Sequence, residues 1–501
     1  WVTLALSLAV FMQVLDTTIA NVAIPTIAGN LGASSSQGTW VITSFAVANA
    51  ICIPITGLLA KRLGEVRLFL LSTAGFVVTS WLCGVAPSLE TLILFRVMQG
   101  ALAGPMIPLS QSLLLAAYPN DKKGMALALW SMTVVVAPIF GPILGGWISD
   151  NWHWSGIFFI NVPIGILVLW AGWPILRHRE TDTFVLPVDK IGLALLVVGV
   201  GSLQIMLDKG KDLGWFGSWV IVTLAVVAVI GIVALIIWEL TDPHPIIDLF
   251  LFRSRNFTIG TIAISLGYML YFGAILLLPL LLQAQLGYTA FQAGLATAPV
   301  GILPVFLSPI IGKNAHRLDM RVLVTFSFLM YAVCFWVRTY FTPQMSMSWV
   351  VWPQFWQGLA VACFFMPLTT IAFAGLKPHQ LASASSLSNF LRTLAGSIGA
   401  SIVNTMWERR EAFHHATLTQ AINPYNPLSN QAITNMQAAG LTDTQSYAYL
   451  AKSITQQGYI LGSNEIFGLS AMLFIGMTVV VWLAKPPFGA KTGGAPAGSG
   501  H

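Results

Sequence analysis

FGSWVIVTLAVVAVIGIVALIIW, residues 216–238, contains no charged side chain. As an α-helix this stretch would measure about 34 Å at ~1.5 Å per residue, enough to cross a hydrocarbon core of ~30 Å. Only 8% of the residues in the chain are charged, whereas 56% are hydrophobic. A water-soluble fold would have too little polar surface to present to solvent, so the sequence predicts an all-α polytopic membrane protein.

Fourteen apolar runs follow one another along the chain, and each is about long enough to span a bilayer. They occupy residues 3–25, 37–60, 67–86, 91–117, 124–148, 156–176, 190–207, 216–238, 257–283, 290–311, 322–340, 348–374, 380–407 and 462–484. We therefore expect 14 transmembrane helices. The connection at 408–461 is too long for a simple turn, and its apolar residues are spaced as in short amphipathic helices.

Most Lys and Arg residues lie in every second gap between these runs. One set of gaps holds 16 of them, and the other set holds six, to which we assign Arg338. Arg96 and Arg392 lie inside apolar runs. By the positive-inside rule the first set is cytoplasmic, which places both termini in the cytoplasm and residues 408–461 outside. The net charge of +6 therefore reflects topology and does not indicate nucleic acid binding.

Several common features are missing from the sequence. The first run lacks a basic leader and a cleavage site, so we expect a spanning helix and not a removable signal peptide. The four cysteines lie in predicted helices, which argues against a disulfide framework or a zinc site. No phosphate-binding G-x-x-x-x-G-K-[ST] loop occurs, so neither a nucleotide nor another cofactor is expected. We expect residues 485–501 to form a disordered cytoplasmic tail, since the sequence is rich in Gly and Ala from Gly489 on.

The pattern G-x-x-A-[KH]-R-L occurs twice, at Gly57–Leu63 and at Gly312–Leu318, after the second and the tenth runs. Two parallel six-helix halves explain this placement, and we assign them to residues 1–177 and 257–484. Two inserted helices then fall in residues 178–256.

A second pair of matching segments supports the same register. Gln99-Gly100 precedes a proline in the fourth run, and Gln357-Gly358 does so in the twelfth. Three residues before each Gln-Gly pair, the first half has Arg96 whereas the second half has Gln354.

Five segments together resemble the major facilitator superfamily, and within it the fourteen-spanner drug:proton antiporters. These segments are the first-helix signature Leu15–Pro25, the loop motif Gly57–Arg67, the helix-four motif Arg96–Gly100, the antiporter motif Gly141–Gly146 and the helix-six entry Trp152–Pro163. The resemblance implies a major facilitator fold with two six-helix bundles and two inserted helices. It also implies proton-driven export of hydrophobic drugs across the bacterial inner membrane.

The long external connection is similar to that of the inner-membrane subunits of three-part drug pumps. This likeness implies two protein partners, a periplasmic adaptor of the membrane-fusion type and an outer-membrane channel. We expect residues 408–461 to form the docking surface for the adaptor or a cap over the exit; the alternative is a solvated loop without a role.

Asp16 is the leading candidate for proton coupling. A carboxylate in the middle of a membrane helix costs roughly 2.5–3.5 kcal/mol, so its presence needs a reason. Gln13, Asp16, Thr17 and Asn21 share one helical face, which predicts a polar stripe along a wet cavity. The alternative is a structural hydrogen bond between two helices.

The basic residues inside the runs have different expected roles. Arg96 keeps its proton in proteins, so it can tune a neighbouring carboxylate but cannot carry the transported proton. Arg392 is a possible second-half charge, and a purely structural ion pair is an equally good interpretation.

The family motifs supply the remaining site predictions. The loop motif implies a gating role for Gly57, Arg62, Gly64 and Arg67, although this chain has Lys61 where the family usually has Asp. The antiporter motif implies a tight, leak-proof helix contact at Gly141, Pro142, Gly145 and Gly146. A drug cavity could be lined by Tyr268, Tyr271, Trp356 and Gln357, although such aromatic residues more often serve packing.

Two other classes of function compete with proton-coupled export. A membrane-embedded enzyme would need a nucleophile with its base, or clustered metal ligands, at membrane depth, and the sequence shows neither. A passive channel or uniporter would need no intramembrane carboxylate and no pair of rocking halves. The sequence therefore favours an antiporter with no catalytic and no metal-binding residues.

Overall fold

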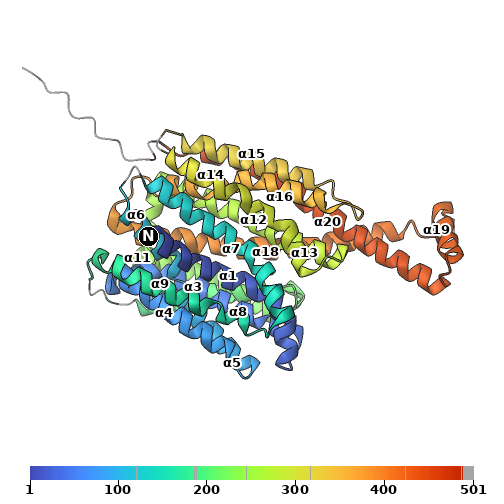
Figure 1. The fold of residues 1–501 in the computed structure, drawn as a ribbon, viewed down its shortest axis with the longest axis horizontal. Helices are drawn as coiled ribbons and strands as arrows, with labels where there is room; N and C mark the ends of the chain where they lie inside the picture. The colour runs from blue at the N-terminus through green and yellow to red at the C-terminus, as the bar shows by residue number, and fades with distance from the viewer. Residues whose placement is uncertain are drawn as a thin grey trace, which may run out of the picture.

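The computed structural model describes residues 1–119, 122–184, 187, 189–243, 245–315, 317–423, 425–486 and 488. Every regular element in these ranges is helical, and thirteen spans in them are long and apolar enough to cross a membrane (Figure 1). The prediction of an all-α polytopic membrane protein is thereby confirmed. Most of the tail predicted to be disordered, residues 489–501, lies outside the described residues.

Along the chain the first bundle comes first, the two inserted helices follow it, and the second bundle comes last. The first bundle contains α1 (Val2–Asn30), α3 (Trp40–Leu63), α4 (Glu65–Gly84), α5 (Leu89–Ala103), α6 (Met106–Ala117), α7 (Lys123–Asn151), α8 (Gly156–Phe159) and α9 (Asn161–Leu176), with the short α2 (Ser35–Gly38) beside them. The inserted helices are α10 (Lys190–Lys209) and α11 (Trp219–Thr241). The second bundle contains α12 (Arg255–Leu286), α13 (Ala290–Thr297), α14 (Ile302–Lys313), α15 (Met320–Arg338), α16 (Met347–Ala362), α17 (Phe365–Ala372), α18 (Leu381–Thr419) and α20 (Asp443–Val481), and α19 (Pro427–Ala438) joins the last two.

Four of the predicted runs are broken helices in the structure, and one of them, 156–176, is divided at Ile160 between α8 and α9. The run 91–117 is interrupted at Gly104-Pro105, where Pro105 precedes the first residue of α6. The run 348–374 is interrupted at Cys363-Phe364, at the corresponding place in the second half. The run 290–311 passes through a 3-10 turn at Ala298–Gly301. Breaks of this kind persist inside a membrane only where neighbouring protein surrounds the backbone.

The predicted run 380–407 forms the first part of α18, which is too polar to count among the thirteen spans. Its first ten residues, Leu381–Phe390, are nevertheless all buried. The helix α18 packs against α3 and α6 of the first bundle as well as against α12 and α20. The many serines of this segment are tolerated because neighbouring helices supply hydrogen-bond partners.

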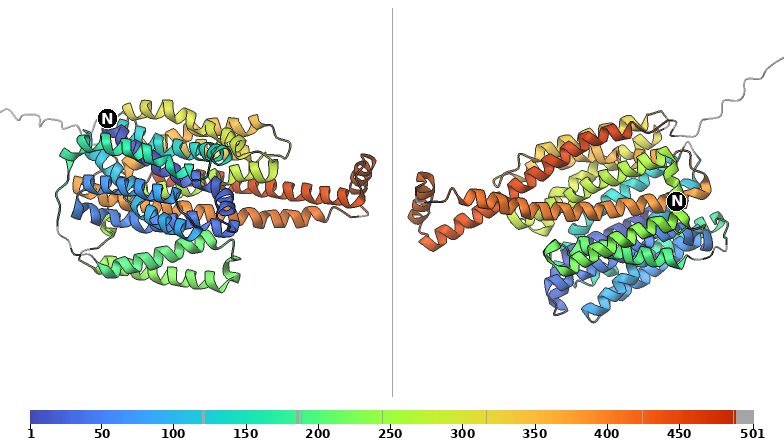
Figure 2. Two further views of the ribbon diagram at one scale, coloured as in Figure 1. Left: turned by 60° about the horizontal axis from the view of Figure 1, so that its bottom comes forward. Right: turned by 180° about the vertical axis from the view of Figure 1, so that it is seen from behind.

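The long connection contains more helix than the short amphipathic helices that were predicted for it. Residues 408–461, which we call the helical hairpin, continue α18 outward to Thr419 and begin the inward-going α20 at Asp443. Only α19 is a separate short helix of the predicted kind. The hairpin projects away from both bundles and does not fold back over them as a cap (Figures 1 and 2).

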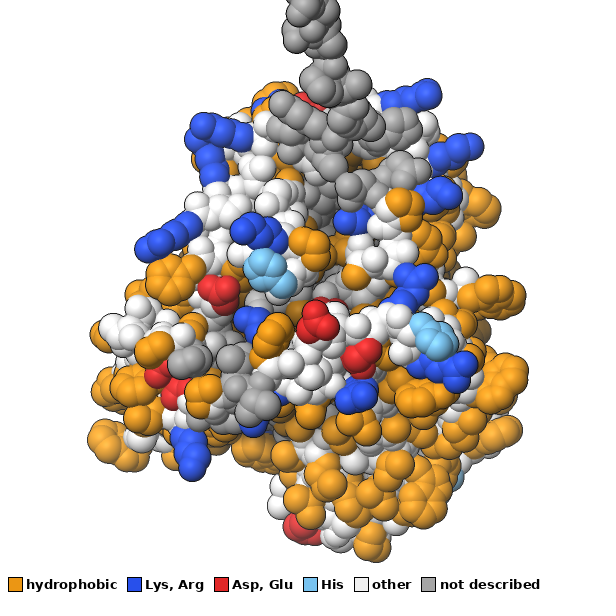
Figure 3. All heavy atoms as spheres, turned by 90° about the vertical axis from the view of Figure 1, so that its left-hand side faces the viewer, with side chains coloured by type: hydrophobic (Ala, Val, Ile, Leu, Met, Phe, Trp, Pro, Cys, Tyr) orange, Lys and Arg blue, Asp and Glu red, His pale blue; other side chains and the backbone are white. Residues whose placement is uncertain are grey.

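The two bundles are joined most closely at the end of the molecule where the N-terminus lies, which we call the basic end. Lys and Arg side chains gather on this face (Figure 3). Here a Cβ added to Gly57 of α3 would lie 3.1 Å from Ser383 Cα of α18, and one added to Gly312 of α14 would lie 2.8 Å from the Gly124 carbonyl oxygen of α7. From this end the bundles diverge toward the hairpin (Figure 2).

Candidate functional site

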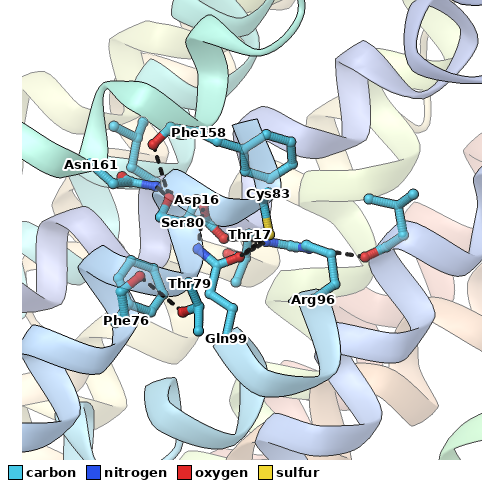
Figure 4. Close-up of polar contacts among 12 residues, drawn as sticks. Asp16, Thr17, Phe76, Thr79, Ser80, Cys83, Arg96, Gln99, Phe158 and Asn161 are labelled. Carbon is cyan, nitrogen blue, oxygen red and sulfur yellow. Dashed lines mark hydrogen bonds and ion pairs between the residues drawn. The ribbon is translucent and has the colours of Figure 1, made fainter. Parts of the chain in front are cut away.

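Asp16 lies in the middle of α1 and has no exposed surface. Its Oδ2 accepts a hydrogen bond from Arg96 Nη1 at 2.6 Å. Its Oδ1 accepts one from Asn161 Nδ2 at 2.7 Å and one from Gln99 Nε2 at 3.2 Å (Figure 4). Three donors from α5 and α9 therefore stabilise the charged form of this carboxylate, as a buried ion pair requires.

Arg96 is enclosed as completely as Asp16. Its Nε donates to the Val41 carbonyl at 3.0 Å, and its guanidinium lies over the Phe45 ring with the Cζ 4.2 Å from the ring centroid. Its Nη1 also donates to Gln99 Oε1 at 2.7 Å. The second terminal nitrogen, Nη2, is buried without a partner among the described residues. Arg96 thus holds Asp16 in place and keeps one donor free.

Asn161 and Ser80 belong to the same network, although the residue patterns did not single them out as site residues. Asn161 Nδ2 donates to Ser80 Oγ at 3.0 Å, and Ser80 donates to the Phe158 carbonyl at 2.9 Å. Asn161 is the first residue of α9, after the break between α8 and α9. A polar amide inside an apolar run is the feature of the sequence that could have pointed to Asn161.

The residues of the predicted polar stripe on α1 do not form one hydrogen-bonded group. Gln13, three residues before Asp16, is buried, and its Oε1 has no partner among the described residues. Thr17 donates to the Val14 carbonyl of its own helix at 2.7 Å. Asn21 is exposed. The structure therefore brings Asp16 together with residues of α5 and α9, not with the other members of its stripe.

The antiporter motif packs against α1 directly beside Asp16. A Cβ on Gly141 would lie 2.2 Å from Thr18 Oγ1, and one on Gly145 would lie 2.9 Å from the Ile19 carbonyl oxygen. Gly146 is buried as well, and the side chain of Pro142 lies outside the described set. Glycine at positions 141 and 145 is therefore what allows α7 to approach α1 this closely.

Arg338, which we assigned to an external gap between the apolar runs, lies within a helix in the structure. It ends α15, is 1% exposed, and its Nη2 donates to Gln354 Oε1 at 2.8 Å and to Gln357 Oε1. Gln357 holds the place in the second half that Gln99 holds in the first. The second half has Gln354 where the first half has Arg96, and Arg338 of the preceding helix α15 supplies the guanidinium instead. Matching residues of the two halves position by position therefore does not reveal it.

Comparison with known proteins agrees with this geometry. Residues 6–400 match the sequence profile of the Major Facilitator Superfamily. The chain belongs to this superfamily. It is 65% identical over 496 residues to the multidrug export protein EmrB of Escherichia coli, which covers 99% of this chain and 97% of that protein. It is 58% identical over 494 residues to the fatty acid resistance protein FarB of Neisseria gonorrhoeae, covering 99% and 97%.

Among solved structures, a bacterial homologue of the human drug peptide transporters PepT1 and PepT2 is similar with a TM-score of 0.58 and 16% identity, covering 96% of this chain and 97% of that one. At this identity the likeness concerns the fold alone. The chain is accordingly a multi-pass transporter of the major facilitator superfamily and not an enzyme.

The loop motif of this major facilitator chain has an unusual partner. Gly64 has a φ of +88° and precedes α4, whose Val66 and Arg67 amides donate to the Glu180 carboxylate at 3.0 and 2.9 Å. A Cβ on Gly64 would collide with that carboxylate. Arg67 is exposed, with its Nε 3.9 Å from Glu180, and Arg62 is half-buried at the end of α3. Glu180 therefore supplies an acid at this helix N-terminus in a chain that has Lys61 in place of the usual Asp.

The residues predicted for a drug cavity separate into three places. Tyr268 and Tyr271 lie on α12 with ring centroids 6.4 Å apart, and Arg392 lies 5.4 Å from the Tyr268 centroid. Gln357 is buried on Arg338. Trp356 is 50% exposed and lines a separate apolar groove of about 430 Å³ between α15 and α16. Of the predicted cavity residues, only Tyr268 and Tyr271 thus lie together, and Tyr268 also contacts Arg392.

Proposed function

We propose that this chain is a proton-driven exporter of hydrophobic drugs, which exchanges drug for protons across the bacterial inner membrane by alternating access. The observation that carries the proposal is the ion pair of Asp16 and Arg96 in the membrane interior. A carboxylate there is costly, and titratable groups at membrane depth typically mark proton or substrate pathways.

The contacts of Asp16 suggest how one proton could be coupled to movement of the helices. The charged carboxylate joins α1 to α5 and α9 through Arg96, Gln99 and Asn161. When Asp16 takes up a proton, its attraction for Arg96 falls and α1 is released from this network. Loss of the proton on the other side of the membrane restores the ion pair. Asp16 thus carries the proton, while Arg96 favours its release.

The arrangement of the halves fits an outward-facing state in this mechanism. Side-chain hydrogen bonds between the two bundles, among the described residues, all involve Ser385, Ser386 and Asn389 of α18. These bonds lie toward the basic end, which we assign to the cytoplasm because Lys and Arg gather there (Figure 3). Both termini are then cytoplasmic, and the helical hairpin projects into the periplasm.

The names of two relatives support the proposed class of substrate. One is named a multidrug export protein and another a fatty acid resistance protein, and both names fit export of hydrophobic compounds. A rigid hairpin on the outer side offers a surface for a periplasmic adaptor of the membrane-fusion type, which would pass drug on to an outer-membrane channel. We propose these two proteins as partners.

The energy supply is adequate without a nucleotide. One proton moving across 100 mV supplies about 2.3 kcal/mol, which sustains roughly a forty-fold concentration gradient of drug.

Purified protein in liposomes with an imposed pH gradient tests the proposal. Adding a fluorescent hydrophobic drug should cause proton movement that depends on drug, and Asp16→Asn should abolish it. Asp212→Asn is the matched control, because Asp212 is a half-exposed carboxylate in the loop after α10. Drug flux that is indifferent to the gradient would instead favour a passive channel or uniporter.

A further inference from the structure

Arg392 is a buried cation without a counter-charge. It lies on α18, inside the membrane-spanning part of the chain, and is 5% exposed. It forms no hydrogen bond or ion pair with any residue that the structure describes, and its Nε is buried without a partner. Its contacts are aromatic: Cζ lies 5.4 Å from the Tyr268 ring centroid and 5.9 Å from that of Phe365.

The other two guanidiniums at membrane depth show what Arg392 lacks. Arg96 donates to a carboxylate, an amide and a carbonyl. Arg338 donates to two amide oxygens. An isolated charge in an apolar interior is strongly unfavourable, and two aromatic faces compensate only part of that cost. The fold therefore holds Arg392 ready for an acceptor that no described residue provides.

The position of Arg392 shows where such an acceptor would lie. Asn389, one helical turn earlier on the same face of α18, donates to Gln111 of α6 at 2.9 Å and closes the contact between the bundles. Arg392 is one turn beyond this bond along α18. Asn389 Oδ1 is also buried without a partner, so two unsatisfied polar atoms lie on this face. The site therefore lies one helical turn from the contact between the two bundles.

The chemistry of the site selects its ligand. A guanidinium beside aromatic rings presents its N–H groups from its edge, and this fork matches the two oxygens of a carboxylate. Tyr268 and Phe365, whose ring centroids lie 6.1 Å apart, together offer apolar surface beside the charge, and Phe272 stacks on Tyr268 with ring centroids 5.3 Å apart. A ligand that satisfies both features has an anionic head and a hydrophobic or aromatic body.

We propose that Arg392 binds the carboxylate of hydrophobic organic acids, and that Tyr268 and Phe365 bind their apolar part. This inference rests on the proposed export function, since it names a substrate class and a specificity-determining residue for it. A neutral compound of the same shape gains the aromatic contacts but leaves the guanidinium unsatisfied, so the site should prefer the acid.

Binding of pyrenebutyrate and of its neutral analogue pyrenebutanol tests the proposal. Both are followed by pyrene fluorescence on the purified full-length protein in detergent, without a proton gradient, so that a failure of proton coupling does not affect the outcome. The wild-type protein should bind the acid at least about ten-fold more tightly than the alcohol, in line with the loss of one charge-assisted hydrogen bond. Equal affinity for the two ligands would overturn the proposal without any variant.

Substitutions locate the effect. Arg392→Gln should weaken binding of pyrenebutyrate about ten-fold or more and leave pyrenebutanol within about two-fold, and Arg392→Lys should give an intermediate loss for the acid only. Arg409→Gln is the matched control, because Arg409 is an exposed arginine on the same helix. Loss of both ligands in parallel, with a folded Arg392→Lys variant, would overturn a role in recognition of the acid.

An anionic phospholipid offers a similar headgroup charge and must be distinguished. Phosphatidylglycerol is therefore titrated into the same samples, with phosphatidylcholine as the neutral comparison. Binding of pyrenebutyrate that persists unchanged supports an organic acid as the ligand. Displacement by phosphatidylglycerol alone, lost in Arg392→Gln, would assign the site to lipid and overturn the proposal.

Discussion

Asp16 and Arg96 lie 80 residues apart in the sequence, yet Oδ2 of the first is 2.6 Å from Nη1 of the second, and neither side chain reaches solvent. Gln99 bonds to both of them, and Asn161 adds a third donor to the carboxylate. The proton-carrying group that we propose is therefore part of a buried polar network, and its members can be tested separately.

Asp16→Asn should reduce drug-dependent proton flux to background while drug binding persists. Asn keeps the size and polarity of the side chain but cannot exchange a proton at neutral pH. The measurement is proton release in liposomes on addition of drug. Near-normal flux in this variant would show that Asp16 is not the carrier.

Removal of Asp16 also leaves Arg96 as an unpaired buried charge, which typically costs about 3–5 kcal/mol. The double variant Asp16→Asn, Arg96→Gln should therefore unfold at a higher temperature than Asp16→Asn alone and should still lack proton flux. Thermal unfolding in detergent separates the two effects. Recovery of flux in the double variant would contradict the role of Asp16.

Gly141→Ala should impair transport through the packing of α7 on α1. The new Cβ would lie 2.2 Å from Thr18 Oγ1, so α1 must shift beside Asp16, and overpacking of this kind costs about 1–3 kcal/mol. Gly172→Ala is the control, because the nearest atom to its Cβ is 3.8 Å away. Both variants are compared by thermal unfolding and by liposome antiport. Equal behaviour would show that the close contact at Gly141 has no functional weight.

Arg338→Leu should destabilise the second bundle without abolishing proton coupling. It removes the donor to Gln354 and Gln357 and leaves two buried amide oxygens with one partner fewer, at a cost of about 1–3 kcal/mol. The unfolding temperature should fall while drug-dependent proton flux per folded molecule stays near that of the wild type. A stable variant without proton flux would place Arg338 in the coupling mechanism.

Shortening the helical hairpin should separate export across the membrane from delivery to an adaptor. Gly458 of α20 packs near Glu411 of α18, so a short Gly/Ser linker in place of residues 412–457 can connect the two helices at that level. Liposome antiport should persist, whereas association with the adaptor and resistance of whole cells should be lost. Retention of both would show that the partner binds elsewhere.

The sequence predicted the class of fold well, because apolar length and the distribution of Lys and Arg depend on the bilayer and not on details of packing. It was less informative about α18. There a membrane helix is rich in serine, and its burial depends on α3, α6 and α12, which a single run of sequence does not reveal. The outward continuation of α18 and α20 was missed for a related reason, since their polar ends show no boundary between membrane and solvent.

Among the site residues, Asp16 and Arg96 were predictable because each is a charge inside an apolar run. Their direct contact was not, since it depends on how α1 and α5 cross. Arg338 was assigned to the outside because it stands at the end of a run, and only the fold shows that Gln354 and Gln357 surround its guanidinium. Asn161 is an ordinary amide in the sequence, and its role follows from the place where α9 begins.

The helical hairpin has a mechanical consequence. Because α18 runs without interruption from the contact between the bundles to Thr419, the projection behaves as a stiff lever attached to the second bundle. A helix of this length measures about 58 Å, so a tilt of that bundle by roughly 10° would move the tip sideways by about 10 Å. Each transport cycle would then displace any protein bound to the lever, so the transporter could signal its conformation to that protein by motion alone.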